Sequence, residues 1–314
     1  MKKRKGITRL AAIAMACILI LAAFIVISYI TQFKESGRQT GFTVIDDYER
    51  AITVPKNPQR IISLAPGCTE IIFAVGLGTK VVGVDDYSNY PEAAKNITKI
   101  GSYLSPNLEV MVLSEPDLIL ASDMTSKEYI TSLEEKNLTV FILAPKAIQG
   151  IIRDIRLVGI IGNKTKEADN LINSLEQRIN VIASKTKSNT LYTPRVYLEY
   201  YPYWAYGPGS FGNDLISMAG GKNIAATAAS AYSEVASEFI VSSNPELIIF
   251  TIGPYVSTTT KDIKSRTGWD RISAVRNNKI YAIYDDIISR PGPRIVDALE
   301  QLAKMIHPEL FPSK

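Results

Sequence analysis

Tyr103–Ile119, YLSPNLEVMVLSEPDLI, and Tyr232–Ile248, YSEVASEFIVSSNPELI, repeat one pattern 129 positions apart. Aligned without a gap, the two stretches share a tyrosine, a glutamate six residues later, a valine, a serine and then Pro-acid-Leu-Ile. Each copy predicts a short helix that begins near the glutamate, a proline that ends it, and a buried strand. A helix–strand unit used twice indicates two similar α/β lobes that face each other. Clefts between such lobes are where small ligands usually bind.

Strands and helices alternate on both sides of this repeat. We predict strands at Arg60–Leu64, Lys80–Val84, Leu118–Ala121, Val140–Leu143, Arg195–Tyr200, Leu247–Ile252 and Lys279–Ile283. We predict helices at Thr69–Val75, Lys127–Lys136, Asn213–Ala219 and Ile295–Ile306, and a hairpin that joins Phe42–Asp46 to Arg50–Val54. The alternation indicates mainly parallel sheets with helices on both faces. The predicted fold class is therefore α/β, with two Rossmann-like lobes and a ligand cleft between them.

A long helix without proline or glycine separates the two halves, at Lys164–Lys187. Its apolar residues recur at helical spacing, at Ala168, Leu171, Ile172, Leu175, Ile179 and Ile182. No flexible linker lies near the midpoint, so we interpret this helix as a rigid connection between the lobes; an ordinary packing helix inside one lobe is the alternative. The predicted parts are an anchor or signal (1–32), a stalk and hairpin (33–56), an N-terminal lobe (57–147), a helical connector (148–188) and a C-terminal lobe (189–314).

The N-terminus predicts a membrane anchor. A basic cluster, MKKRK, is followed by Arg9 and by an uncharged run from Leu10 to Ile30. Twenty-one helical residues span about 31 Å, the thickness of a bilayer core, and the basic end should stay in the cytoplasm. A cleaved signal peptide, or a lipid-modified Cys17 after Ala14-Met15-Ala16, is the competing interpretation. We expect an uncleaved transmembrane helix with the binding domain on the extracellular or periplasmic side.

The composition of the exported part argues against several classes of function. Five of the 35 basic residues precede the apolar run, which leaves 30 basic against 31 acidic residues. A nearly neutral body does not indicate a nucleic-acid surface. Cys68 is its one cysteine and His307 the chain's one histidine, so no disulfide and no transition-metal cluster can be drawn. We therefore expect no metal site, no cofactor of its own and no catalytic residues, with an exported α/β hydrolase as a distant alternative.

Tyrosines in loops and at strand ends are the strongest sign of a binding site. The chain has 16 tyrosines against 9 phenylalanines. Tyrosine offers a flat apolar face and a hydroxyl, which suits a large, partly polar ligand. We assign Tyr87, Tyr103 and Tyr232 to the cleft, with Trp204 and Asp286 as weaker candidates.

Glu109 and Glu238 occupy the same place in the two repeats, at the start of a predicted helix. A carboxylate there stabilises a helix dipole, which explains one of them well. It explains less readily why each follows a tyrosine by six residues. We predict that the pair serves in docking a partner and does not touch the ligand.

Several motifs together resemble one known family. Arg60–Pro66 with Thr69-Glu70, the turn Tyr87-Ser88-Asn89-Tyr90-Pro91, Asn107-Leu108-Glu109, Gly220–Ile224, Trp269 and Arg290–Arg294 resemble periplasmic binding proteins for cobalamin and iron siderophores. The resemblance covers about Phe42 to Phe311. It implies a monomeric two-lobe protein with a helical backbone that delivers its ligand to an ABC importer, and it places Glu109 and Glu238 where family members pair with arginines of the permease dimer.

The cobalamin-binding members are the most similar, because of the Tyr-Ser-Asn-Tyr-Pro turn and the double acid Asp285-Asp286. In them, aromatic residues at the positions of Tyr87, Tyr103 and Tyr232 line the cleft. This chain has tyrosine at the last two positions, where tryptophan is found in the member compared, and Ser122 at a further tryptophan position. The resemblance thus implies a corrinoid ligand such as cobalamin, with a ferric siderophore or haem as alternatives.

Overall fold

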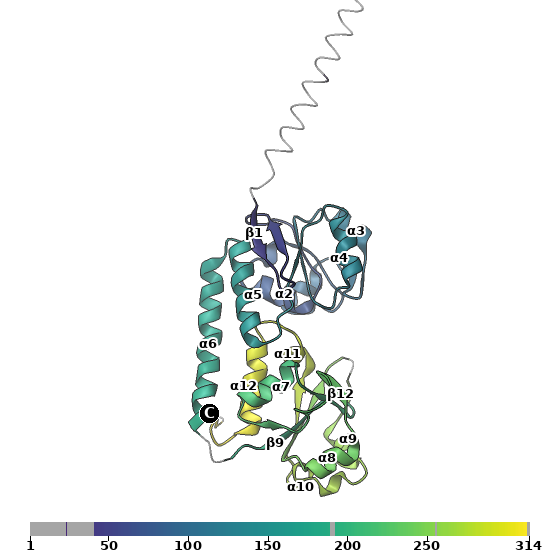
Figure 1. Ribbon diagram of the computed structural model, residues 1–314, viewed down its shortest axis with the longest axis vertical. Coiled ribbons are helices and arrows are strands. Elements are labelled where there is room, and N and C mark those ends of the chain that lie inside the picture. The colour runs from purple at the N-terminus through teal and green to yellow at the C-terminus, as the bar shows by residue number, and fades with distance from the viewer. Residues whose placement is uncertain (1–22, 24–40, 189–191, 255, 313–314) are drawn as a thin grey trace, which may run out of the picture.

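A computed structural model of the chain describes residue 23 and residues 41–188, 192–254 and 256–312. Two α/β lobes lie one above the other, and a long helix, α6 (Thr165–Ser188), runs along one side of both (Figure 1). The predicted membrane anchor, 10–30, lies outside the described residues apart from Ala23. Within the described ranges, no helix combines the length and the apolar character that crossing a bilayer requires.

The N-terminal lobe is built on a parallel sheet in the order β4-β3-β7-β8. Its strands are β3 (Ile61–Ser63), β4 (Val81–Val84), β7 (Leu118–Ala121) and β8 (Val140–Ile142). Their residues are nearly all buried, as expected of a parallel sheet that helices cover on both faces. The surrounding elements are α2 (Pro66–Ala74), α3 (Leu108–Leu113), α4 (Lys127–Glu134), α5 (Ile148–Ile161), and the 3₁₀ turns Gly78–Lys80 and Glu92–Asn96.

Two small antiparallel hairpins complete this lobe. The predicted hairpin is confirmed as β1 (Phe42–Ile45) and β2 (Ala51–Val54), in register from Phe42 opposite Val54. It packs on the sheet, because Asp47 donates its amide to the Ile142 carbonyl and accepts from the Ala144 amide at 2.7 Å. The second hairpin, β5 (Gly101–Ser102) and β6 (Ser105–Pro106), precedes α3 and was not predicted.

The C-terminal lobe has a mixed sheet in the order β12-β10-β9-β13-β14, with β11 beside β9. Its strands are β9 (Arg195–Tyr201), β10 (Trp204–Tyr206), β11 (Lys222–Asn223), β12 (Tyr232–Glu234), β13 (Leu247–Ile252) and β14 (Ile280–Tyr284). Its helices are α7 (Phe211–Met218), α8 (Ser237–Ser243), α9 (Thr260–Ser265), α10 (Ser273–Arg276), α11 (Asp285–Ser289) and α12 (Ile295–Ile306), with a 3₁₀ turn at Trp269–Arg271. The core strands are parallel as predicted, whereas β10 and β12 run antiparallel at one edge.

The predicted strands and helices are confirmed within a few residues. The largest difference is at α2, which begins at Pro66 and not after the Pro66-Gly67 turn. Proline is favoured in the first turn of a helix, where its missing amide donor would have no helical partner. The repeat is confirmed at its second half, since α3 leads into β7 and α8 leads into β13.

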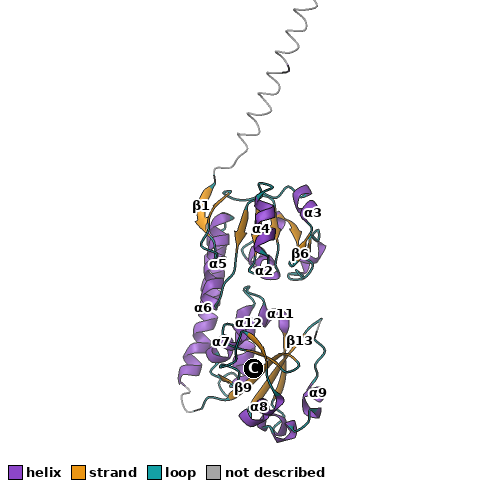
Figure 2. Cartoon of the chain, turned by 45° about the vertical axis from the view of Figure 1, so that its right-hand side comes forward, coloured by secondary structure: helices purple, strands orange, loops and turns teal. Residues whose placement is uncertain are grey.

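The connecting helix α6 (Thr165–Ser188) packs on α5 of the N-terminal lobe and on α7 and α12 of the C-terminal lobe. Its buried residues Ile172, Leu175 and Ile179 belong to one apolar core that continues into both lobes. Figure 2 shows the same arrangement from another side, with α11 and α12 near the junction. The alternative of a packing helix inside one lobe is therefore wrong.

Candidate functional site

Two of the predicted cleft tyrosines come together in the N-terminal lobe. Tyr87 follows β4, and Tyr103 lies in the turn between β5 and β6. Their ring centroids are 5.2 Å apart with an interplanar angle of 51°. Tilted rings at this distance attract each other through their quadrupoles, so the two side chains form one apolar surface with hydroxyl groups at its edge.

The segment that carries Tyr87 is fastened by a buried polar network. Asp85 accepts the Tyr87 amide at 2.8 Å and the Ser88 hydroxyl, and Ser88 also contacts the Thr69 hydroxyl at 2.7 Å. The Lys99 ammonium donates to the Ser88 carbonyl at 2.8 Å. Burial raises the pKa of Asp85, which these hydrogen bonds and Lys99 partly offset. This network of hydrogen bonds holds the backbone of residues 85–88 and so positions the Tyr87 side chain.

Three tyrosines pack together in the C-terminal lobe, with Tyr206 fully buried and Tyr232 40% exposed. Tyr232 in β12 lies directly opposite Tyr206 in β10, because the two strands pair antiparallel in that register. Tyr200, near the end of β9, completes the group; its ring centroid is 5.2 Å from that of Tyr232 and 5.7 Å from that of Tyr206. Of these, the sequence pattern assigns only Tyr232 to the cleft, because strand pairing between β10 and β12 is not visible in the sequence.

The two tyrosine groups lie near each other across the lobes. The pKa of Tyr200 is raised by burial, by Asp285 and by Tyr103 of the other lobe. Burial raises the pKa of Tyr232 to about 12, with smaller contributions from Tyr200, Asp285 and, from the N-terminal lobe, Asp123. The hydroxyls of Tyr200 and Tyr232 are therefore protonated at neutral pH and can both donate and accept hydrogen bonds.

Asp285 and Asp286 have different partners. Asp285 accepts from the Ser289 hydroxyl at 2.6 Å and the Tyr206 hydroxyl at 3.3 Å, beneath the three tyrosines. Asp286 pairs with Arg290 at 2.7 Å and accepts from Asn89 of the N-terminal lobe at 3.3 Å. The structure thus puts the predicted Asp286 at a contact between the lobes and its neighbour Asp285 among the tyrosines. The sequence shows the double acid but not which of the two faces the aromatic group.

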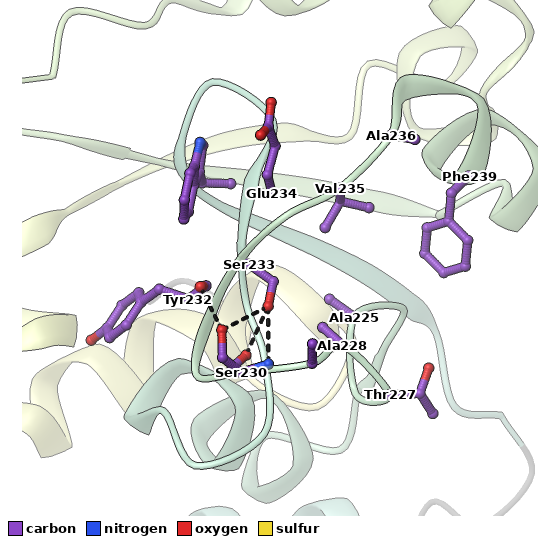
Figure 3. A pocket seen from close by; sticks show the side chains of 12 residues that line it. Ala225, Thr227, Ala228, Ser230, Tyr232, Ser233, Glu234, Val235, Ala236 and Phe239 are labelled. Atoms are coloured by element: carbon purple, nitrogen blue, oxygen red, sulfur yellow. Dashed lines mark hydrogen bonds between the residues drawn. The ribbon is translucent and has the colours of Figure 1, made fainter.

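Trp204 lines a separate hollow of about 500 Å³. Figure 3 shows this hollow, with Tyr232, Val235 and Phe239 among the side chains that line it. Every residue that lines this hollow belongs to the C-terminal lobe; they include Ala228, Ser230, Val235 and Phe239. Trp204 therefore shares a wall with Tyr232 but is not grouped with Tyr200 and Tyr206.

Glu109 and Glu238 are exposed in the first turns of α3 and α8, one on each lobe. Neither carboxylate forms an ion pair or a side-chain hydrogen bond within the part of the chain that the structure describes. The Asn107 side chain, not Glu109, caps α3 by accepting the Val110 amide at 3.1 Å. Both glutamates are thus available to a partner.

Among the described residues, no group of three or more His, Cys, Asp and Glu side chains could hold a metal ion. What the arrangement offers is two sets of tyrosines, one on each lobe, with the Asp285 carboxylate beside the second set. Such a surface can grip a flat, partly polar molecule without covalent chemistry.

Comparison with known proteins agrees with this geometry. A family model described as periplasmic binding protein matches residues 61–287. The chain belongs to this family. An ABC transporter substrate-binding lipoprotein of Bacillus subtilis, YvrC, is 31% identical over 86% of each chain. The crystal structure of the periplasmic vitamin B12 binding protein BtuF of Vibrio cholerae is 26% identical, with a TM-score of 0.70, and covers 82% of this chain and 100% of its own.

The fold also occurs in the periplasmic haem-binding protein RhuT from Roseiflexus, at 24% identity and a TM-score of 0.72, over 80% of this chain and 99% of that one. The predicted family and the two-lobe fold are confirmed. The chain is a substrate-binding protein of an ABC importer and not an enzyme, so the hydrolase alternative is excluded.

Proposed function

We propose that the chain captures a corrinoid, cobalamin in the first place, between its lobes and delivers it to the permease of an ABC importer. The observation that carries this proposal is the pair of tyrosine groups, Tyr87 with Tyr103 on one lobe and Tyr200 with Tyr232 on the other. A corrin ring is broad, largely apolar on its faces and edged with amides. Tyrosine rings would cover its faces, and tyrosine hydroxyls and Asp285 would bond its amides.

The charges near the tyrosines favour a ligand without strong negative charge. Lys146 pairs with Asp123 at 2.7 Å, Arg290 pairs with Asp286, and Arg294 pairs with Glu70. A haem or an anionic ferric siderophore would need cations for its carboxylates, and these cations already have carboxylate partners. For this reason we prefer cobalamin as the ligand and keep haem and ferric siderophores as the alternatives.

Delivery requires docking on the importer. We place the permease contact at Glu109 and Glu238, one exposed carboxylate on each lobe, because a permease dimer presents two equivalent surfaces. We further propose that the protein works as a monomer, held at the extracellular or periplasmic face of the membrane by the segment 10–30.

The test is a titration of the full-length chain in detergent with cobalamin, followed by quenching of tyrosine and tryptophan fluorescence. Haemin and a ferric siderophore are titrated in parallel. Saturable binding of cobalamin, with at least tenfold weaker binding of the other two, is the expected result. Tighter binding of haemin or the siderophore would replace the corrinoid proposal by that ligand.

A further inference from the structure

The segment Arg290–Arg294 of the C-terminal lobe reaches across to the N-terminal lobe. Arg294 donates from Nε and Nη2 to the two carboxylate oxygens of Glu70, at 3.0 and 2.5 Å. The Glu70 side chain is only 2% exposed, and the Arg294 guanidinium also lies 4.0 Å from the centroid of the Tyr90 ring. A bidentate pair of this kind fixes direction as well as distance.

Arg290 reaches the segment that carries Tyr87. Its Nη1 donates to the Asn89 side-chain oxygen at 2.7 Å, and its Nη2 donates to the Tyr87 carbonyl at 3.3 Å. The same guanidinium pairs with Asp286 of its own lobe at 2.7 Å. Arg290 therefore holds the backbone of a cleft tyrosine from the opposite lobe.

The two lobes come into close contact at this point. A Cβ added to Gly67 would lie 2.8 Å from the Pro291 carbonyl oxygen, and one added to Gly292 would lie 2.9 Å from a Glu70 carboxylate oxygen. A Cβ atom essentially never comes this close to another heavy atom. Glycine at both positions thus permits an approach that brings Arg290 and Arg294 within reach of their partners.

We propose that Arg290 is a positioning residue for ligand binding: with Arg294 and Glu70 it fastens the lobes together and sets where Tyr87 and Tyr103 stand relative to Tyr200 and Tyr232. The N-terminal lobe holds the Tyr87 amide through Asp85, and Arg290 holds the Tyr87 carbonyl from the other side. A cleft fixed in this way is preorganised, so the ligand does not bear the entropic cost of ordering it. This inference rests on the proposed function in one respect, which is that Tyr87 contacts the ligand.

The test compares Arg290→Gln and Asn89→Ala with the parent, all full-length in detergent. A Cys17→Ser background carries spin labels at Glu128→Cys and Lys261→Cys, exposed positions on α4 and α9. Pulsed electron-spin distance measurements without ligand report on the lobes, and cobalamin titration reports on binding. We expect a broader distance distribution in both variants and about tenfold weaker binding in Arg290→Gln, which corresponds to 1.4 kcal/mol.

Arg178→Gln is the matched control. Arg178 also contacts two carboxylates, Asp297 at 2.5 Å and Glu300 at 2.7 Å, but it joins α6 to α12 away from the tyrosines. This variant should keep the parent's distance distribution and affinity even if its melting temperature falls. Parental distance distributions in both Arg290→Gln and Asn89→Ala would overturn the proposal. A parent that does not bind cobalamin would refute the proposed ligand, while the distances would still decide the role of Arg290.

Discussion

Tyr103 of the N-terminal lobe packs against Tyr87 at 5.2 Å and lies close enough to the opposite lobe to raise the pKa of Tyr200. It is thus a member of one aromatic group and a neighbour of the other. A ligand held between the lobes would therefore contact Tyr103 as well as the tyrosines of the C-terminal lobe.

Tyr103→Ala and Tyr232→Ala should each weaken ligand binding by about 5- to 150-fold, because the loss of one stacked aromatic ring at a binding site commonly costs about 1–3 kcal/mol. Both side chains are partly exposed, so the melting temperature should change little. Titration of each variant with cobalamin measures the effect. Tyr192→Ala serves as the control, since Tyr192 is 52% exposed and bonds Glu246 near the start of β9, whereas Tyr200 lies near the end of that strand. Two variants that bind as tightly as the parent would remove these tyrosines from the site.

The sequence predicted the elements of the fold well, because the signals involved are local. Parallel strands such as β7 and β13 are buried on both faces, so their apolar runs are continuous and bounded by turn residues. The repeat also placed α3 and α8 correctly. The two copies of the repeat differ in structure at their tyrosines, because Tyr103 lies in a turn whereas Tyr232 begins a strand of the sheet.

Contacts between distant residues could not be predicted in this way. Glu70 and Arg294 are 224 positions apart, and the sequence around either residue does not indicate that the two side chains form an ion pair. Tyr200 and Tyr206 lie beside Tyr232 because β10 pairs antiparallel with β9 and β12, at the edge of a sheet that the alternating pattern predicts as mainly parallel. The choice between Asp285 and Asp286 depends on the rotation of the short helix α11, which two adjacent acids do not encode.

Motion of the lobes on ligand binding should be small. Helix α6 has 24 residues, about 36 Å, and is packed on both lobes. Hinge closure normally uses loop residues that absorb large changes in backbone angles, and α6 offers none in its interior. Small-angle scattering curves of the protein with and without ligand should nearly superimpose. A clear fall in the radius of gyration would show that α6 or its junctions bend.

The pH dependence of stability should carry a contribution from Asp154. This residue is buried in α5 beside Asp47 and Arg153. Burial, reinforced by Asp47, raises the pKa of its carboxyl from 3.8 to about 8. Because the folded state keeps a proton that the unfolded state has lost, the stability from this group is complete below the unfolded pKa and is lost as pH rises toward about 8, at about 1.4 kcal/mol per pH unit.

Asp154→Asn cannot ionise, so its melting temperature relative to the parent should rise steadily from pH 5.5 to 8 and then level off. Asp169→Asn, at a side chain 51% exposed on α6, is the control and should follow the parent at every pH. A constant difference between Asp154→Asn and the parent across this range would mean that Asp154 is already ionised in the folded protein.

Glu109 and Glu238 should act in transport and not in ligand binding. Reversing both to lysine should leave cobalamin affinity unchanged, because each carboxylate is exposed and neither belongs to the tyrosine groups. Transport, or stimulation of the importer's ATPase in liposomes, should be abolished. Exposed ion pairs contribute only about 0–1 kcal/mol, whereas removing one partner from a pair desolvated on docking costs about 2–5 kcal/mol. Single reversals should therefore be intermediate, and added salt should slow association of the parent with the importer.

The matched control for this prediction combines Glu128→Lys with Asp270→Lys. These are exposed acids in the first turns of α4 and of the 3₁₀ turn Trp269–Arg271, again one on each lobe. The control changes the net charge by the same amount as the double reversal, so a general loss of electrostatic steering would lower transport in both proteins. Loss confined to the Glu109 and Glu238 variant would locate the docking contacts on α3 and α8. Normal transport by that variant would leave both glutamates with the helix dipole alone, worth a few tenths to about 1 kcal/mol of stability.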